Sequence, residues 1–539
     1  MGTQWVCIAA VLSVASATSL TQVVVGQTFL AGSTDPTQGS TAWALTSHGI
    51  AEKLFTVDRQ GAIVGQLGES VRKLDALSWE VTLKSGFKFS DGTPLTADHV
   101  VDAFTQLNQV NSAAQASLGA MTVTQVGSAT VRIQSERATP VMDAVLAEWP
   151  FVVYLVRDGQ RLFTGPFAVQ TFVEGDKFEL VPNPHYPGAV GRPHVTIQKY
   201  ASGHELATAL EAGQLDLAFH LPVDVLPNLR AQEGITMKSF EVGYHYMMFH
   251  NTRATSGSAL SDVRVRRAVD VAIDRQALSQ ELRGGRGTRS LFPDYTPYFQ
   301  EDTQTHGDRS AAEALLDEAG WIKEAGGTAR FKDGAPLTLK VVAYPQRPGL
   351  VIMLPVISQA LAALGIAVNE IVTSGDSWDQ LDQIIADKDF DLLLWAQNTL
   401  PAGDPQWFLN AFFRSDGGNN HAGFFSSEID SLLDNLAPAE APAQRQSATA
   451  AVHTAILAEV PVSNLVTPEW HVGLSDRLST YEPWGSDYYV IRADLACTSC
   501  TDAVPTTTSQ VGEQWTSSAI RVIVGGLSAA GLLLHALLA

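Results

Sequence analysis

The segment from Trp79 to Phe104 has the most informative pattern of apolar and polar positions in the chain. Trp79, Val81 and Leu83 alternate with polar residues, which is the period of a half-buried strand. Residues 90–92, with the sequence Ser-Asp-Gly, supply turn chemistry, and Thr96 precedes a stretch whose apolar residues repeat at helical spacing. The pattern therefore predicts a strand, a turn and a capped amphipathic helix, in that order.

Strand-like and helix-like segments continue to alternate along the body of the chain. A strand is expected over residues 22–30, and two short strands should flank the turn at Gly165-Pro166. A helix over residues 205–212 is followed by a buried strand that ends at Phe219. This alternation predicts an α/β body built on mixed sheets.

Length and charge narrow the class of protein. The chain has 539 residues, 45% hydrophobic and 17% charged, which is a globular composition too long for one core, so we expect two or three domains. Lys and Arg number 35 against 56 Asp and Glu, and the net charge of −21 disfavours nucleic acid and anionic membranes as partners. An exported, water-soluble body is the expected class.

The N-terminal segment has the pattern of a signal peptide. Residues 1–17 are mostly apolar and end in Ala15-Ser16-Ala17, as a cleavage site would, although the basic residues usual at the start are missing. Cleavage would remove Cys7 and leave Cys497 and Cys500, which we expect to form a local disulfide outside the cell. The alternatives for this cysteine pair are a redox pair and half a zinc site.

The C-terminal segment has the pattern of a membrane anchor. Residues 501–521 form a polar linker, and residues 522–539 form an apolar tail. The tail fits either a membrane anchor or a cleavable signal for a glycolipid anchor, and its length is marginal for a spanning helix. Either form would tether the protein to a membrane.

Several further motifs follow one another in a fixed order. They occupy residues 163–167, 183–186, 213–218, 261–275, 311–321, 391–395, 403–405 and 428–433. Together with residues 79–104 they resemble the family 5 extracytoplasmic solute-binding proteins, which serve peptide and nickel ABC transporters. The resemblance implies a single helix over residues 261–275. Most of these residues also have a purely structural explanation: Arg264 and Asp274 as helix caps or partners in an ion pair between lobes, and Gly320-Trp321 as a helix end.

The resemblance implies an α/β, two-lobed, periplasmic-binding-protein-like fold of type II, with an extra subdomain inserted in lobe I. Lobe I would comprise residues 22–50, 160–245 and 465–500, the inserted subdomain residues 51–159, and lobe II residues 246–464. Crossing strands are expected near residues 244–251 and 461–468. Closure of the lobes on a ligand would produce the change of conformation that a transporter reads.

Candidate ligand-binding residues lie on the first crossing strand and near the ends of later elements. Tyr244, Tyr246 and Met248 alternate along one strand face, which would line the cleft or belong to the core. Arg347, flanked by prolines, would present a rigid fork to an anionic ligand. The remaining candidates are Trp395, Asp404 and Trp407.

The resemblance offers two kinds of ligand. Family members that bind peptides pair the free ammonium with an aspartate three residues before the acidic residue of a Gly-Asp-Pro motif. Here that position is Pro401, and Asp404 of the motif fits a turn or a helix cap. Residues 417–424 resemble the loop of nickel-binding members in which one histidine touches the metal and a small chelator supplies the other ligands. His421 would be that histidine, because neutral imidazole suits Ni(II).

The sequence contains none of the common hydrolase or nucleotide-binding motifs, so an enzyme is not expected. We predict an extracytoplasmic solute-binding protein, acting as a monomer, that captures a small peptide or a chelated nickel ion. It would deliver this ligand to the membrane subunits of an ABC transporter, and it would need no cofactor other than Ni(II) as cargo. The alternatives are a membrane-tethered receptor without a transporter and a hydrolase.

Overall fold

The computed structural model describes residues 22–59, 62–188, 191–253, 258–301 and 307–496. The predicted signal peptide, polar linker and C-terminal tail, together with all three cysteines, lie outside these residues. Across the ranges described, none of the helices combines the length and apolar character needed to cross a membrane.

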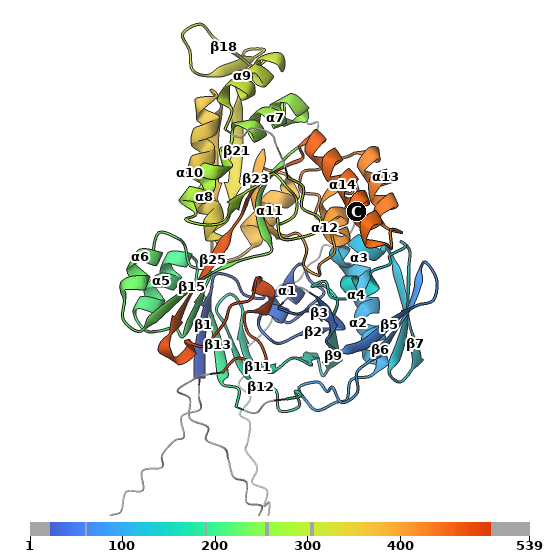
Figure 1. Ribbon diagram of the computed structural model, residues 1–539. Helices are drawn as coiled ribbons and strands as arrows, with labels where there is room; N and C mark the ends of the chain where they lie inside the picture. The colour runs from blue at the N-terminus through green and yellow to red at the C-terminus, as the bar shows by residue number, and fades with distance from the viewer. Residues whose placement is uncertain (1–21, 60–61, 189–190, 254–257, 302–306, 497–539) are drawn as a thin grey trace, which may run out of the picture. The chain divides into compact units, whose positions relative to one another are not determined.

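One main sheet has seven strands, contributed by the beginning, the middle and the end of the described chain (Figure 1). Its strand order is β11 (Phe167–Val173), β12 (Lys177–Pro182), β13 (His194–Lys199), β1 (Gln22–Gln27), β14 (Leu217–Phe219), β25 (Glu469–Ser475) and β15 (Ile235–Glu241). β1 runs parallel to both β13 and β14, and the other pairs are antiparallel. The strand predicted to begin at residue 22 is thus confirmed, although it ends at Gln27.

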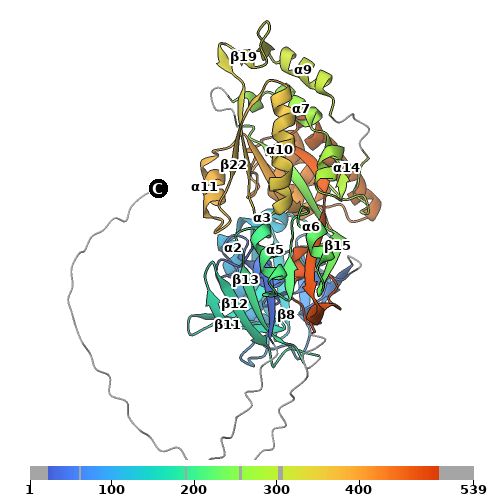
Figure 2. The same ribbon diagram turned by 90° about the vertical axis from the view of Figure 1, so that its left-hand side faces the viewer.

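The other main sheet has six strands. Its order is β17 (Arg286–Gly287), β24 (Val462–Thr467), β16 (Tyr244–His250), β23 (Leu392–Asn398), β21 (Thr338–Ala343) and β22 (Ala367–Val372). The long helix α10 (Pro348–Ala363) packs along β21, β22 and β23, and Figure 2 shows it beside β22. The chain passes from the seven-stranded to the six-stranded sheet at residues 242–243 and returns at Pro468.

A four-stranded antiparallel sheet forms between residues 68 and 135. Its order is β5 (Gly68–Lys73), β6 (Ser78–Leu83), β8 (Thr130–Ser135) and β7 (Met121–Gly127). Helix α2 (Ala97–Val110) packs on β7 and β8 and is followed by α3 (Ser112–Leu118). The predicted strand, turn and helix are confirmed here, and the Thr96 backbone N–H donates to Nδ1 of His99 at 3.1 Å, which completes the helix cap.

The remaining elements are short sheets and the other helices. The sheets are β10 (Gln160–Phe163)–β9 (Val152–Arg157)–β2 (Glu52–Lys53), β18 (Ile322–Lys323)–β19 (Arg330–Lys332)–β20 (Ala335–Pro336) and β3 (Phe55–Val57)–β4 (Ile63–Gly65). The helices are α1 (Thr41–Ser47), α4 (Met142–Val145), α5 (Gly203–Glu211), α6 (Leu226–Ala231), α7 (Val263–Ala272), α8 (Arg275–Glu281), α9 (Arg309–Glu318), α11 (Asp379–Asp387), α12 (Gln406–Phe413), α13 (Ser427–Leu436) and α14 (Pro442–Glu459).

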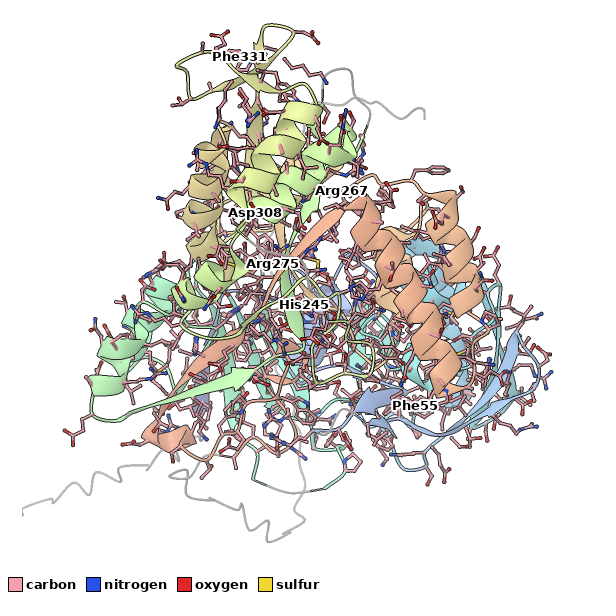
Figure 3. All side chains as sticks on the ribbon, turned by 45° about the horizontal axis from the view of Figure 1, so that its top comes forward. Phe55, His245, Arg267, Arg275, Asp308 and Phe331 are labelled. Carbon is pink, nitrogen blue, oxygen red and sulfur yellow. The ribbon has the colours of Figure 1, made fainter. Side chains whose placement is uncertain are left out.

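The motif over residues 261–275 spans two helices rather than one. Asp274 caps α8, because its side chain accepts from the backbone N–H groups of Gln276 and Ala277. Arg275 (labelled in Figure 3) is buried and donates to the backbone oxygen of Asn464, which ties α8 to β24. The motif therefore has a structural role, as expected from its residue types.

Candidate ligand-binding cleft

A cavity of about 740 Å³ lies between elements attached to the two main sheets. Its wall includes the loop after β1, the N-termini of α1 and α3, the segment after β21, helix α11 and the end of β23. Cavities of roughly 300–1,000 Å³ are typical of small-molecule sites. Because both sheets contribute to the wall, a molecule held here would contact elements of both.

Aromatic side chains make up much of the cavity wall. They are Trp43, Trp149, Trp378, Trp395, Trp407, Tyr244, Tyr344 and Tyr488. The centroid of the Tyr344 ring lies 5.6 Å from that of Trp378 and 5.5 Å from that of Trp395. These rings give the cavity flat apolar faces, against which planar or apolar parts of a ligand can pack.

Arg347 projects from the start of α10 into a box of four aromatic rings. Its guanidinium carbon lies 5.3–5.6 Å from the ring centroids, within the range of cation–π attraction. The four rings are those of Phe29, Trp43, Tyr244 and Trp470. The Arg347 side chain is only 5% exposed, so its charge requires a nearby anion.

That anion is the carboxylate of Asp487, in the short 3₁₀ helix η3 (Asp487–Tyr489). Nη2 of Arg347 donates to Oδ2 of Asp487 at 2.6 Å. The Oδ1 atom accepts from the Tyr244 hydroxyl at 2.5 Å and from Nε1 of Trp43 at 3.2 Å. Burial raises the pKa of the Asp487 carboxyl, and the Arg347 guanidinium opposes that rise. The chain therefore balances the charge of Arg347 itself.

His421 lies in the cavity wall, in the loop that follows α12. Its ring centroid is 4.7 Å from that of Trp395, and the side chain is buried except for 9% of its surface. Nε2 has no hydrogen-bond partner among the described residues. Burial lowers the pKa of His421 to about 3, with smaller contributions from Lys388 and Arg253. The imidazole is therefore neutral at physiological pH, and in the tautomer protonated at Nδ1 its Nε2 carries a lone pair that no described residue uses.

The His421 loop is fixed by hydrogen bonds on both sides of the histidine. The Asn420 side chain donates to the Phe424 carbonyl and accepts from the Phe424 N–H, which closes a tight ring around residues 420–424. Nη1 of Arg253 donates to the His421 carbonyl at 3.3 Å. These contacts hold the backbone of the loop on both sides of His421, as a preformed ligand site requires.

Four of the predicted site residues besides His421 also line the cavity. They are Tyr244, Arg347, Trp395 and Trp407. The prediction that Arg347 offers its fork to a ligand has to be modified, since the fork already binds Asp487.

Tyr246, Met248 and Asp404 lie outside the cavity wall. The Tyr246 hydroxyl accepts from Nε1 of Trp470 at 3.0 Å, and Met248 is fully buried within the six-stranded sheet. Asp404 forms an ion pair with Arg445, and its Oδ1 accepts from the backbone N–H of Gln406 at the start of α12. Asp404 thus closes the turn before α12, whose N-cap is Pro405, and a turn was one of the two roles that its sequence context indicated.

The charged groups of the wall are mostly acidic. Besides Arg347, they are Glu174, Asp376, Asp379, Asp382 and Lys199. Burial raises the pKa of Asp382, and the Lys199 ammonium donates to the backbone carbonyl of Asp376. With Arg347 balanced by Asp487, the wall presents net negative charge.

Direct hydrogen bonds join the two sides of the cleft near α3 and α12. Nε1 of Trp407 donates to the Ala113 carbonyl at 3.2 Å, and Nε2 of Gln406 donates to the Ser117 carbonyl at 3.0 Å. These contacts hold α12 against α3 beside the cavity.

Metal-ligating side chains are not clustered. In the described ranges, no group of three or more His, Cys, Asp or Glu side chains is arranged to hold a metal ion. A metal at His421 would therefore need most of its ligands from a chelator that enters with it.

The sequence interpretation missed three residues of the wall, Trp43, Tyr344 and Trp378, and also Asp487, which pairs with Arg347 behind the wall. Tyr344 stands next to the proline-flanked segment that contains Arg347, so that segment was a usable signal. Asp487 is 140 residues away from Arg347 in the chain, and no local pattern connects the two.

Two mixed α/β sheets joined by two chain crossings, with a ligand-sized cavity between them, define a solute-binding protein of the periplasmic-binding-protein fold. The model of the family "Bacterial extracellular solute-binding proteins, family 5 Middle" matches residues 62–420, and the chain belongs to this family. This match confirms the resemblance found in the motifs. Members of the family are solute-binding proteins and not catalysts.

Similar proteins include a nickel-binding protein and a probable dipeptide-binding protein. The nickel-binding protein NikA of Staphylococcus aureus is 24% identical over 455 residues, which cover 82% of this chain and 88% of that protein. The probable D,D-dipeptide-binding protein DdpA of Escherichia coli is 25% identical over 393 residues, which cover 67% of this chain and 70% of that protein.

Two solved structures have the same fold. NikA from S. aureus in complex with Ni(L-His)2 has a TM-score of 0.79 at 21% identity, covering 88% of this chain and 99% of that chain. AppA from Bacillus subtilis in complex with a nonapeptide has a TM-score of 0.74 at 19% identity, covering 86% and 96%.

Proposed function

We propose that this protein captures a small nickel chelate in the cleft, with His421 as the ligand that the protein gives to the metal. The observation that carries the proposal is the buried Nε2 of His421, which faces no hydrogen-bond partner among the described residues. Buried polar atoms nearly always have a partner, so an unpaired one in the wall of a cavity calls for a functional explanation. Neutral imidazole is a good ligand for Ni(II).

The surroundings of His421 suit a chelate better than a bare ion. The described residues contain no group of three or more metal-ligating side chains, so carboxylates or amines of the chelator have to complete the coordination. The ring of Trp395 lies against the imidazole and gives an apolar face for the body of the chelator. The relative from S. aureus, which is named for nickel and was crystallised with Ni(L-His)2, supports the same ligand class.

A short peptide is the second candidate ligand. The aromatic walls and the volume of the cavity favour it, and AppA, of the same fold, was solved with a nonapeptide. A carboxylate for the peptide ammonium is the weak element, because Asp404 is bound to Arg445 and position 401 is a proline. The acidic side chains of α11 would have to replace it.

Delivery to an ABC transporter is part of the proposal. Ligand that bridges both sheets stabilises the closed form, and the transporter subunits would recognise that form. We further propose a monomer that is exported by residues 1–17 and tethered by residues 522–539. A tethered receptor without a transporter is the alternative, and it requires the same cleft.

Native mass spectrometry of the purified full-length chain tests the ligand. The protein is mixed with Ni(II) alone, with Ni(II) plus L-histidine, and with a pool of short peptides. We expect a mass shift that needs both nickel and histidine and that is lost in His421→Ala. His204→Ala is the matched control, since His204 is exposed and pairs with Asp224 on the surface. Peptide adducts that persist in His421→Ala, without a chelate adduct in the unaltered protein, would reject the metal chelate and favour the peptide.

A further inference from the structure

The ion pair between Arg347 and Asp487 lies at the wall of the cavity, with Arg347 in the wall and Asp487 behind it. We infer that Asp487 is a specificity-determining residue, whose carboxylate fills an anion site in the cleft wall and thereby excludes ligands that carry a free carboxylate there. The inference deepens the proposed function and relies on it for the chelate, whereas the exclusion of carboxylates can be tested without nickel.

Three donors from three separate elements converge on the Asp487 carboxylate. They are Nη2 of Arg347 before α10, the hydroxyl of Tyr244 on β16 and Nε1 of Trp43 on α1. A cation and two neutral donors around two oxygens are a complete carboxylate site. The aromatic rings around the guanidinium exclude water, which strengthens each of these bonds.

The site opens toward the cavity but is filled from behind. Arg347, Tyr244 and Trp43 all belong to the cavity wall, whereas Asp487 does not and has no exposed surface. Helix η3 holds Asp487 in place, since the Ser486 hydroxyl caps the Tyr488 N–H and the Tyr489 hydroxyl contacts that of Thr56 at 3.0 Å. The chain thus supplies, from behind the wall, the negative charge that a ligand carboxylate would otherwise supply from the cavity.

The consequence for ligands follows from charge. With Arg347 neutralised, the cavity wall contains four carboxylates and Lys199, which itself donates to the Asp376 carbonyl. A ligand carboxylate in this part of the cleft would lose its hydration without gaining a cation, and such burial is unfavourable. The cleft should therefore take neutral or cationic chelates and reject anionic ones.

Asp487→Asn tests the inference, because it removes the charge and keeps the shape. The probes are acetate and a matched pair of nickel complexes, one with tris(2-aminoethyl)amine, which is dicationic, and one with nitrilotriacetate, which is anionic. Both chelators are tripods that leave two positions on the metal for His421 and water. The unaltered full-length protein should bind the cationic complex at least tenfold more tightly and show no thermal stabilisation by acetate.

In Asp487→Asn the preference should shift toward the anionic complex by at least tenfold, and acetate should raise the unfolding temperature. The double variant Arg347→Gln/Asp487→Asn should lose both gains, because it has no cation to offer. Asp494→Asn is the matched control, since Asp494 is exposed on the same C-terminal segment. If Asp487→Asn folds only in acetate, that dependence supports the inference.

Two results would overturn the inference. One is equal binding of the two complexes by the unaltered protein, and the other is an Asp487→Asn variant that acetate does not stabilise or refold. Failure of the unaltered protein to bind either complex would instead contradict the nickel proposal, and the acetate experiment would still decide the role of Asp487.

Discussion

The pair Arg445–Asp404 and the pair Arg347–Asp487 are both buried, yet their surroundings differ. Arg445 donates to both carboxylate oxygens of Asp404, and its other partners are the Gln406 side-chain oxygen and the carbonyls of Leu436 and Ala439. Arg347 donates once to its aspartate and, at 3.4 Å, to the Gln346 carbonyl, and it is otherwise surrounded by four aromatic rings, of which those of Trp43 and Tyr244 line the cavity. We infer that Arg445, whose N–H donors are bound by polar groups, stabilises the fold, whereas Arg347, which lines the cavity, determines which ligands bind.

The largest expected effect comes from breaking the Arg445 pair. Asp404→Asn leaves a buried guanidinium without its counter-charge, which typically costs about 3–5 kcal/mol of unfolding free energy. Denaturant titration measures the loss, and acetate should not restore it, because Asp404 does not line the cavity. Asp434→Asn is the control: its carboxylate is largely exposed beside Arg414, so the change should cost less than about 1 kcal/mol.

Removing the charge of Asp487 should reduce the stability of the protein less when an anion such as acetate is present. Asp487→Asn also leaves a buried guanidinium without its counter-charge, but Arg347 lines the cavity, so acetate bound on the cavity side can supply the missing negative charge. Unfolding temperatures of both variants, measured against acetate concentration, make the comparison. If acetate raised the unfolding temperatures of Asp404→Asn and Asp487→Asn equally, the proposed difference between the two ion pairs would be contradicted.

Lowering the pH should reduce the stability of the protein through His421 in the cavity wall. His421 stays neutral in the folded protein because its pKa is lowered to about 3, whereas in the unfolded chain it takes up a proton below about pH 6.5. Its contribution to stability is thus fully present above pH 6.5 and falls by about 1.4 kcal/mol per pH unit as the pH drops toward 3. His48, His245 and His250 have similarly lowered pKa values and add to the slope.

His421→Asn should therefore reduce the slope of unfolding free energy against pH by about 1.4 kcal/mol per pH unit between pH 6 and 4. Denaturant titrations at several pH values provide the slope. A variant with the slope of the unaltered protein would mean that His421 is protonated in the folded state, and that its lone pair is not available to a metal.

The smallest expected effect concerns Gln406, which connects the two regions. Its Oε1 accepts from Arg445 at 2.9 Å, and its Nε2 donates across the cleft to the Ser117 carbonyl. Gln406→Ala should cost about 1 kcal/mol of unfolding free energy and speed ligand dissociation, since a bond that joins the two sides of the cleft is lost. Stopped-flow release of the nickel complex measures the rate, with Gln444→Ala on the exposed face of α14 as the control. Unchanged release would mean that this bond does not hold the cleft closed.

Much of the fold was predictable because it depends on local patterns. The alternation at residues 79–83 and the Thr96 cap gave a strand and a helix directly, and the order of the motifs gave the family. The helix over residues 261–275 was predicted as one and is two, because Asp274 is an N-cap rather than an interior residue. The division into lobes and an inserted subdomain stays a prediction in its boundaries.

The cavity was predictable only in part. His421 and Trp395 were found from local motifs, and both lie in the wall. Of the three residues predicted on one strand face, only Tyr244 lines the cavity. Tyr246 accepts a hydrogen bond from Trp470, and Met248 is buried in the core of the sheet. Asp487 could not be predicted from the sequence, because its role depends on Arg347, which only the fold brings next to it.

The most direct test of the central claim is a crystal structure of the protein grown with Ni(II) and L-histidine, with anomalous scattering recorded at the nickel edge. The account predicts one strong nickel peak in the cavity, within bonding distance of Nε2 of His421, with the chelator against Trp395. A cavity without nickel, or a peak only at an exposed residue such as His204, would contradict it.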